Sequence, residues 1–563
     1  MLRFVVPFLG AALSAAWLAL PAPAAACGGF FCNNALPVNQ AAERIIFADN
    51  GDGTVTAVVQ ILYSGPGEDF AWVLPVPGRP DVGVSSDAVF TALQLQTDPQ
   101  FQLLRVMDDS CTPPPSSVFV DMGGPVDGSL PGGGGGGVMV VDAGTVGPFD
   151  FVILSVTGMP DDPADVAVEW LVEGGYDVAD LGPDTLRPYL EAGMNLIAFR
   201  LTKGSDTGSI RPIVMTYEAA RPMIPIRPTA VAAEEDMGVM VWVLGESRAL
   251  PLNYRHLVLN EARLNWFQPA SNYDLLVSEA ADEAGGQGFV TEYAEPTSAL
   301  QPILPPVLRD FLAPGRWGRT DDVSLVRNVL RQLVVSTAAG PGGFQQTYLD
   351  GVRDVVRDFV PLPDELSVDD FLRCPFCAGE SGDLGGFDRA AFLEAMDAQA
   401  IAPVRDADAL LASRPYVTRL YTTMSAAEMT VDPEFDFNPD LPAVPRLRQA
   451  TLRTTCPQGW DRRTQRLTLA SGEVVEIGAS GAWPVLGGPA ALRFEQLSTS
   501  GDPVVLIDNT PTFSDTITRS NETVIAARPP PPTVGGAGGC AAGSGASGAL
   551  LALLALARRR RRR

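Results

Sequence analysis

The sequence predicts an α+β protein with a β-rich N-terminal domain, a mainly helical middle region and a small β-rich C-terminal region. Between 27 and 300, short apolar runs alternate with Gly, Asn and Asp turns, which is typical of strands. Between 301 and 445, apolar residues recur at helical spacing. Between 446 and 527, the strand pattern returns.

Turn residues place the first strands and helices of the β-rich domain. The stretch "ERIIFADNGDGTVTAVVQILYSG" has two apolar runs around Asn50 and Gly53, which predicts a hairpin. "SSDAVFTALQLQ" predicts a helix, and "GVMVVDAGTVGPFDFVILSV" predicts a second hairpin that turns near Gly144. In "DDPADVAVEWLVEGG", Pro163 at the first position and Gly174 after the last predict a helix between them.

The rest of the chain continues these two patterns. Further strands are expected in "LRPYLEAGMNLIAFRLT", "IRPIVMTYEAARPMIPIRPTAV" and "MGVMVWVLGE". "DDVSLVRNVLRQLVV" places Val323, Val326 and Leu330 on one helical face, and "FDRAAFLEAMDAQAI" and "DADALLASRPYVTRLYTTM" continue the helical pattern. In the last region, "TQRLTLASGEVVEIG" predicts two strands around Ser471 and Gly472.

The composition supports folded domains and an acidic surface. With 563 residues and 46% hydrophobic content, the chain is long enough for real cores. Its net charge of −26 includes six arginines at the C-terminus, so the body is more acidic still. Such a surface repels nucleic acid, and we expect no nucleic-acid partner. The acidity fits simple solubility or the binding of cations.

The N-terminus predicts export. Residues 1–26 have one early Arg, an apolar stretch and small residues before Cys27, which is typical of a cleaved secretory signal peptide. A lipoprotein signal that acylates Cys27 is the alternative. Residue Ala24 stands where such a signal usually has Leu, and we therefore expect simple cleavage.

The C-terminus predicts a surface anchor. A Pro- and Gly-rich spacer, 528–539, precedes a tail, 540–563, that consists of Cys540, a short apolar run and six arginines. The arginines favour a cytoplasmic end for a membrane-spanning run. This order resembles the myxobacterial C-terminal sorting signal MYXO-CTERM. The resemblance implies a tail-processing enzyme that acts near Cys540, and an uncut membrane anchor is the alternative.

The cysteine count predicts disulfides. Six cysteines lie in the exported body, at Cys27, Cys32, Cys111, Cys374, Cys377 and Cys456. An even number in an oxidising compartment favours full pairing, although the sequence alone leaves the connectivity open. We expect two local bridges, Cys27 to Cys32 and Cys374 to Cys377, and one long bridge from Cys111 to Cys456.

Candidate catalytic groups are few. His256 is the one histidine in the chain, and the hydrolase and phosphate-loop motifs are missing from the sequence. The "CPFC" pair Cys374 and Cys377 is compatible with a structural disulfide, redox exchange or a metal site. The aromatic stretch "LNWFQPASNYDLL", Leu264 to Leu276, fits core packing or stacking on a sugar or peptide ligand. We assign no catalytic residue, no cofactor and no metal.

Several stretches together resemble one family. "ACGGFFC", "LRPYLEAGMNLIAFRLT", "LNWFQPASNYDLLVSEA" with "GFVTEYA", and "YVTRLYTTMSAAEMTVDPEFDFNPDLP" are similar to bacterial exported proteins of domain of unknown function 2330. The resemblance runs from Cys27 to roughly Pro445. It implies no activity and no catalytic residue.

The sequence therefore predicts a protein of the cell envelope, exported and held at the surface by its tail. We expect a structural or binding role toward an unknown envelope ligand, and not an enzyme. A thiol-disulfide oxidoreductase that uses Cys374 and Cys377 is the first alternative. A hydrolase of envelope polymers that uses paired carboxylates is a weaker one.

Overall fold

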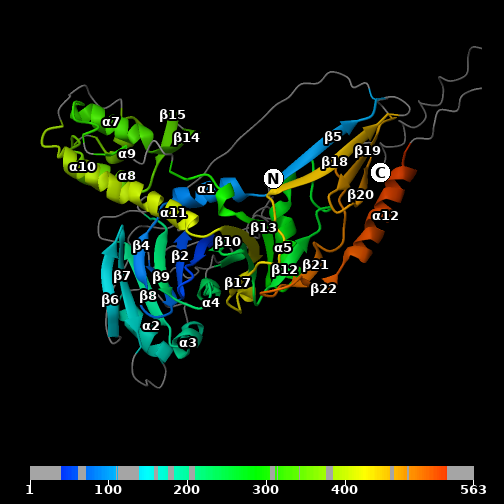
Figure 1. The fold of residues 1–563 in the computed structure, drawn as a ribbon, viewed down its shortest axis with the longest axis horizontal. Helices are drawn as coiled ribbons and strands as arrows, with labels where there is room; N and C mark the ends of the chain where they lie inside the picture. Colours follow the sequence, from blue (N-terminus) through cyan, green and yellow to red (C-terminus); the bar gives the residue numbers. More distant parts are fainter. Residues whose placement is uncertain are drawn as a thin grey trace, which may run out of the picture.

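The computed structural model confirms the α+β class. The structure describes residues 40–528 except 61–70, 110, 112–138, 157–162, 175–182, 202–209, 232, 305–310, 314, 341–342, 365, 376–383, 457–461 and 479–480. A ten-stranded sheet forms its centre (Figure 1). In spatial order its strands are β22 (Val504–Asp508), β21 (Ala491–Gln496), β12 (Arg255–Leu259), β13 (Gly288–Pro296), β16 (Tyr416–Met424), β10 (Ala233–Gly245), β1 (Gln40–Asp49), β2 (Thr54–Gln60), β9 (Ile213–Glu218) and β4 (Asp81–Val84).

The predicted layout of three successive regions is not borne out. The central sheet takes strands from all three, and its pairs β1 with β10 and β12 with β13 are parallel. The helical prediction over "YVTRLYTTM" was wrong, because this segment is β16, which pairs with β10 and β13. Its β-branched and aromatic residues favour a strand. The preceding helix ends at Ala412, before Pro415.

The hairpin predicted around Asn50 is confirmed. β1 and β2 pair antiparallel, with Phe47 opposite Ala57. Gly51 and Gly53 adopt positive φ values of 72° and 89° in the turn, a conformation that glycine reaches without strain. Successive residues of β1 therefore alternate between the two faces of the sheet.

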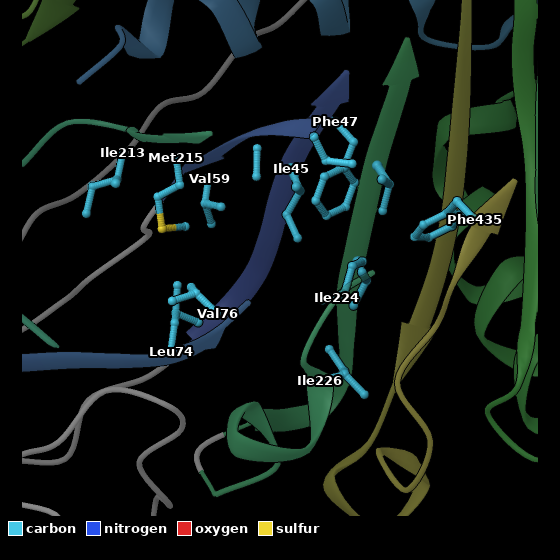
Figure 2. Close-up of a cluster of buried hydrophobic side chains, with 14 of the residues drawn as sticks. Ile45, Phe47, Val59, Leu74, Val76, Ile213, Met215, Ile224, Ile226 and Phe435 are labelled. Atoms are coloured by element: carbon cyan, nitrogen blue, oxygen red, sulfur yellow. The ribbon is translucent and has the colours of Figure 1, made fainter. Parts of the chain in front are cut away.

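A second sheet packs on one of these faces. Its strands are β3 (Ala71–Val76), β8 (Asn195–Leu201), β7 (Phe149–Ser155) and β6 (Met139–Val146). Figure 2 shows Leu74 and Val76 of β3 pointing toward Val59 and Met215 of the large sheet. The outer face of the second sheet packs against α2 (Pro163–Glu173) and α3 (Pro183–Glu191).

Two predictions in this part of the chain needed correction. The second hairpin turns at Gly147, whose φ is 54°, and Gly144 lies within β6 opposite Phe151. The stretch beginning at Leu186 was expected to be a strand, but it forms the end of α3 before β8 begins. The helix predicted between Pro163 and Gly174 is confirmed as α2.

Helices cover the opposite face of the large sheet. α1 (Asp87–Thr97) and α11 (Ala402–Ala412) pack directly on it. A helical layer with its own core lies beyond them (Figure 1). It contains α7 (Asp322–Gln332), α8 (Val352–Phe359), α9 (Val368–Arg373), α10 (Arg389–Met396), η5 (Asp397–Ile401) and the hairpin β14 (Val334–Gly340) with β15 (Gly343–Tyr348).

A third sheet extends from the end of the molecule that lies away from the helical layer (Figure 1). It contains β5 (Gln100–Met107), β18 (Leu447–Thr455), β19 (Thr464–Leu469) and β20 (Val474–Ile477), and α12 (Thr510–Ala526) packs beside β20. The turn predicted at Gly472 joins β19 to β20. The remaining elements are α4 (Ile226–Thr229), β11 (Arg248–Pro251), α5 (Tyr273–Glu283), β17 (Phe435–Asn438) and the short helices η3 (Pro269–Ser271), η4 (Thr297–Ala299) and η6 (Ala426–Glu428).

The two predicted address signals lie outside the described residues. These are the signal peptide, 1–26, and the tail, 540–563. Within the part of the chain that the structure describes, no helix is long and apolar enough to cross a membrane.

Candidate functional site

A polar pocket lies where the end of α1 and the start of α5 meet the large sheet. Its volume is about 680 Å³. Its acidic and basic lining residues are Arg44, Asp98, Asp236, Asp274, Glu292 and Arg419, and we call it the Arg419 pocket. Four carboxyl groups therefore face two guanidinium groups, so the pocket favours hydrogen-bond donors and cationic groups on a ligand.

Arg419 is fixed in the floor of this pocket. The side chain projects from β16 and is only 3% exposed. Its Nε lies 2.7 Å from Glu292 Oε2, and its Nη1 pairs with the carboxylate of Asp98. The guanidinium also lies 5.5 Å from the ring centre of Trp242, a cation–π contact. Contacts on three sides leave Arg419 little freedom to move.

Glu292 holds Arg419 in place. It is 1% exposed, and its Oε1 accepts a 2.6 Å hydrogen bond from the hydroxyl of Tyr273. Burial raises the pKa of Glu292, while the positive charge of Arg419 lowers it. Because both carboxyl oxygens already face protein groups, Glu292 positions Arg419 and does not contact a ligand.

The rim of the Arg419 pocket carries the accessible polar groups. Arg44, on β1, donates a long hydrogen bond of 3.4 Å to Gln60, and burial lowers its pKa. Asp274 is exposed in the first turn of α5. Asp236 is, among the described residues, the one non-glycine residue with a positive φ, 55°. Backbone strain of this kind is concentrated at functional sites.

A second polar pocket adjoins the first. Its volume is about 560 Å³, and we call it the Arg248 pocket. Arg248 is 5% exposed and donates to the carbonyl of Pro442 at 2.9 Å and to Thr291 Oγ1 at 3.1 Å. Burial lowers its pKa to about 10. Arg448 and Arg493 also line this pocket, which makes it more basic than the first.

His256 lies at the edge of the Arg248 pocket. It belongs to β12 and pairs across the sheet with Glu495 of β21, with 3.0 Å between His256 Nδ1 and Glu495 Oε2. Burial lowers the pKa of His256, and the carboxylate of Glu495 opposes this effect. The histidine thus links two strands of the sheet.

An aromatic pair forms a boundary that the two pockets share. Phe101 of β5 and Tyr273 of α5 line both pockets, and their ring centres are 5.4 Å apart. Trp266 supports Phe101 from the core, at 5.6 Å between ring centres. We call the two pockets and this pair the polar cleft. Within the stretch Leu264 to Leu276, Trp266 packs in the core and Tyr273 faces the cleft.

The sequence did not reveal this cleft. Asp98, Glu292 and Arg419 are far apart along the chain, and each is an ordinary charged residue in its own segment. The one signal was Tyr273, in the aromatic stretch. Among the described residues, the structure brings no three metal-binding side chains together.

The long disulfide prediction is confirmed. Cys111 and Cys456 are bonded, with 5.0 Å between their Cα atoms, and they join the segments that follow β5 and β18. Cys374 is also disulfide-bonded. Its predicted partner Cys377 lies outside the described residues, so that pairing stays a prediction. The same holds for the bridge from Cys27 to Cys32 and for the role of Cys540, since these residues are also outside.

The fold is that of a disulfide-bonded α+β protein, and the disulfide indicates an extracytoplasmic location. The chain belongs to the DUF2330 family, described as an uncharacterized protein conserved in bacteria, which matches residues 21–317. The match does not extend to Pro445, where the resemblance was expected to end. No curated protein matches the chain. No solved structure matches it either.

Proposed function

We propose that this protein is exported, is held at the cell surface by its tail, and binds a saccharide chain of the cell envelope in the polar cleft. The observation that carries the proposal is the aromatic pair of Phe101 and Tyr273, which lies between two polar pockets. Apolar faces of a sugar ring pack on aromatic rings, and hydroxyl groups bond to carboxylates and guanidiniums on both sides.

The size and shape of the cleft support a chain-like ligand. Each pocket alone falls in the range of about 300–1,000 Å³ that ligand sites occupy. The two pockets share their aromatic boundary, and we propose that one ligand of several units crosses this boundary and occupies both. The acidic pocket and the more basic pocket then contact different units.

Binding is favoured over hydrolysis because the most buried carboxyl group of the Arg419 pocket is already engaged by other protein groups. A general acid must reach the bond that it protonates. Glu292 is buried and engaged by Tyr273 and Arg419, so the pair of Asp98 and Glu292 serves to orient Arg419. This argument supports the binding role over the envelope-polymer hydrolase.

The redox alternative finds little support at Cys374. A reactive cysteine is activated at a helix N-terminus, where the helix dipole stabilises the thiolate. Cys374 instead caps the C-terminal end of α9, where the dipole has the opposite sign. A structural disulfide fits this position better than an exchanging one.

Surface anchoring is supported by the order of elements in the tail. A spacer, a cysteine, an apolar run and six arginines follow one another in 528–563, as in the sorting signal that they resemble. We infer that a processing enzyme acts near Cys540. Mass spectrometry of the protein from its native envelope tests this, because cleavage predicts a chain that ends near Cys540 and an uncut anchor predicts one that ends at Arg563.

Calorimetric titration tests the ligand site. We expect a soluble tetrasaccharide of N-acetylglucosamine to bind the full-length protein at one saturable site. The exposed acid in the first turn of α5 provides the probe, since Asp274→Asn removes one charged acceptor and should weaken binding about tenfold. Asp184→Asn, in the first turn of α3 outside the cleft, is the matched control and should bind normally.

Three results would contradict the proposal, two from calorimetry with the sugar or with a peptide and one from mass spectrometry of the sugar after the titration. Heat from a tetra-alanine peptide but not from the sugar would assign the cleft to peptides. Equal affinity of the wild-type protein and Asp274→Asn would place the sugar elsewhere. Shortened sugar products in the mass spectrum would make the protein a hydrolase.

A further inference from the structure

An apolar cavity lies between the large sheet and the second sheet, on the face of β1 opposite to the Arg419 pocket. Its volume is about 290 Å³. Ile45, Val59, Leu74, Val76 and Met215 are among the side chains that line it, and Figure 2 shows them around the space. For scale, an engineered cavity of about 150 Å³ in another protein binds benzene.

Two carboxyl groups line this apolar space, and Glu43 is the buried one, whereas Glu434 is 45% exposed beside Arg221. Glu43 lines the cavity and is only 7% exposed. Its Oε2 has no hydrogen-bond partner among the described residues. Buried polar atoms in native proteins are almost always paired, so an unpaired one points to a partner that a ligand supplies. Burial also raises the pKa of Glu43 to about 7, and its neutral form both donates and accepts.

The strand register shows that the long axis of the cavity runs along β1. Glu43 and Phe47 lie on the same face of β1, four residues apart, which corresponds to about 13 Å along the strand. Tyr217 of β9 lines the end near Phe47, since it pairs with Val55 two residues before Ala57, the partner of Phe47. The cavity is therefore elongated, with Glu43 at one end.

The opposite end opens to solvent. Ala220 and Arg221 line the cavity there and are exposed. The guanidinium of Arg221 is already paired with Asp436, at 2.7 Å. A ligand with a free carboxylate would thus meet no unpaired cation among these lining groups, whereas a neutral ligand needs none.

We propose that this cavity binds an elongated neutral apolar molecule whose hydroxyl or carbonyl group bonds to Glu43. The apolar part extends along β1 toward Tyr217, and the open end near Arg221 is the entrance. The site is separate from the polar cleft, because Glu43 and Arg44 point to opposite faces of the sheet. Its test is therefore independent of the saccharide proposal.

Titration with 1-octanol tests the proposal on the full-length protein. We expect calorimetry to show one saturable site for 1-octanol and much weaker binding of octanoate. Glu43→Leu removes the hydrogen bond and should weaken binding of 1-octanol about tenfold, whereas Glu43→Gln keeps a donor and an acceptor and should bind nearly as the wild type does. Ala57→Phe places a ring in the cavity and should abolish binding.

A control separates loss of the site from loss of the fold. Val58 is the neighbour of Ala57 on β2 and packs on the opposite face of the sheet. Val58→Ala therefore destabilises the same strand without touching the cavity, and should bind 1-octanol normally. The proposal is overturned if the wild-type protein shows no saturable binding, if Ala57→Phe binds equally well, or if Glu43→Leu keeps the wild-type affinity.

Discussion

Arg419 and Glu292 face each other at 2.7 Å between adjacent strands, and both side chains are almost completely buried. A buried ion pair costs desolvation energy, and it resists the loss of either partner because the remaining charge is then unpaired. The pair links β16 and β13 in the middle of the large sheet. It also fixes the floor of the polar cleft.

Breaking this pair should destabilise the protein strongly. We expect Glu292→Leu to lower the free energy of unfolding by about 3–5 kcal/mol, because Arg419 then keeps a buried charge with only Asp98. Adding Arg419→Met should recover part of the loss. Urea unfolding measures both. Arg373→Ala, which removes an exposed pair with Asp370, should cost less than about 1 kcal/mol, and a similar cost for Glu292→Leu would contradict the account.

The disulfide should stabilise the third sheet, because it joins the segments that follow its neighbouring strands β5 and β18. It closes a sequence separation of 345 residues. We expect the double variant Cys111→Ala and Cys456→Ala to lose about 2–5 kcal/mol of unfolding free energy. Thermal unfolding without reductant measures this loss. An unchanged melting temperature would show that β5 and β18 hold together without the bond.

Glu43 should make stability depend on pH. Its pKa rises from 4.5 in the unfolded chain to about 7 in the fold. Between these values the unfolded chain releases a proton that the folded state keeps, so stability falls as pH rises from 4.5 to about 7. The loss is about 3 kcal/mol when complete.

Replacing Glu43 tests this directly. Unfolding at several pH values should show a shallower fall for Glu43→Gln than for the wild type. Some fall will remain, because Asp87 also has its pKa raised to about 7, by burial and by the nearby charge of Asp350. Glu218→Gln, at an exposed position of β9, should leave the curve unchanged. Parallel curves for the wild type and Glu43→Gln would contradict the assignment.

Two glycines with the same backbone conformation should differ sharply in tolerance. Gly351 and Gly193 have φ values of 81° and 79°. A Cβ at Gly351 would lie 2.3 Å from the carbonyl oxygen of Gln399, whereas one at Gly193 meets no atom within 4 Å. We expect Gly193→Ala to cost about 1–2 kcal/mol from the backbone alone. Gly351→Ala should cost clearly more, and equal melting temperatures for the two variants would argue against the close approach.

Local signals were sufficient for much of the fold. The turn glycines Gly53 and Gly472 predicted their hairpins, because adjacent strands need only a suitable turn to pair. Pro163 and Gly174 located α2, because Pro favours the first position of a helix and Gly favours the position after its end. The bond from Cys111 to Cys456 followed from assigning the other four cysteines to local bridges.

Long-range pairing explains what sequence reasoning missed. β16 is central because β10 and β13, over one hundred residues earlier, pair with it, and no local pattern reports such partners. The polar cleft arises in the same way, since Asp98, Glu292 and Arg419 meet only after the sheet has formed. The helix α12 was overlooked because it was expected to be part of a strand region.

The most direct test of the central claim is a crystal structure of the full-length protein with the N-acetylglucosamine tetrasaccharide. We predict electron density for the sugar along the polar cleft, with one ring against Phe101 and Tyr273 and hydrogen bonds to Asp274 and Arg44. An empty cleft at saturating sugar, or density only at another surface, would contradict the proposed function.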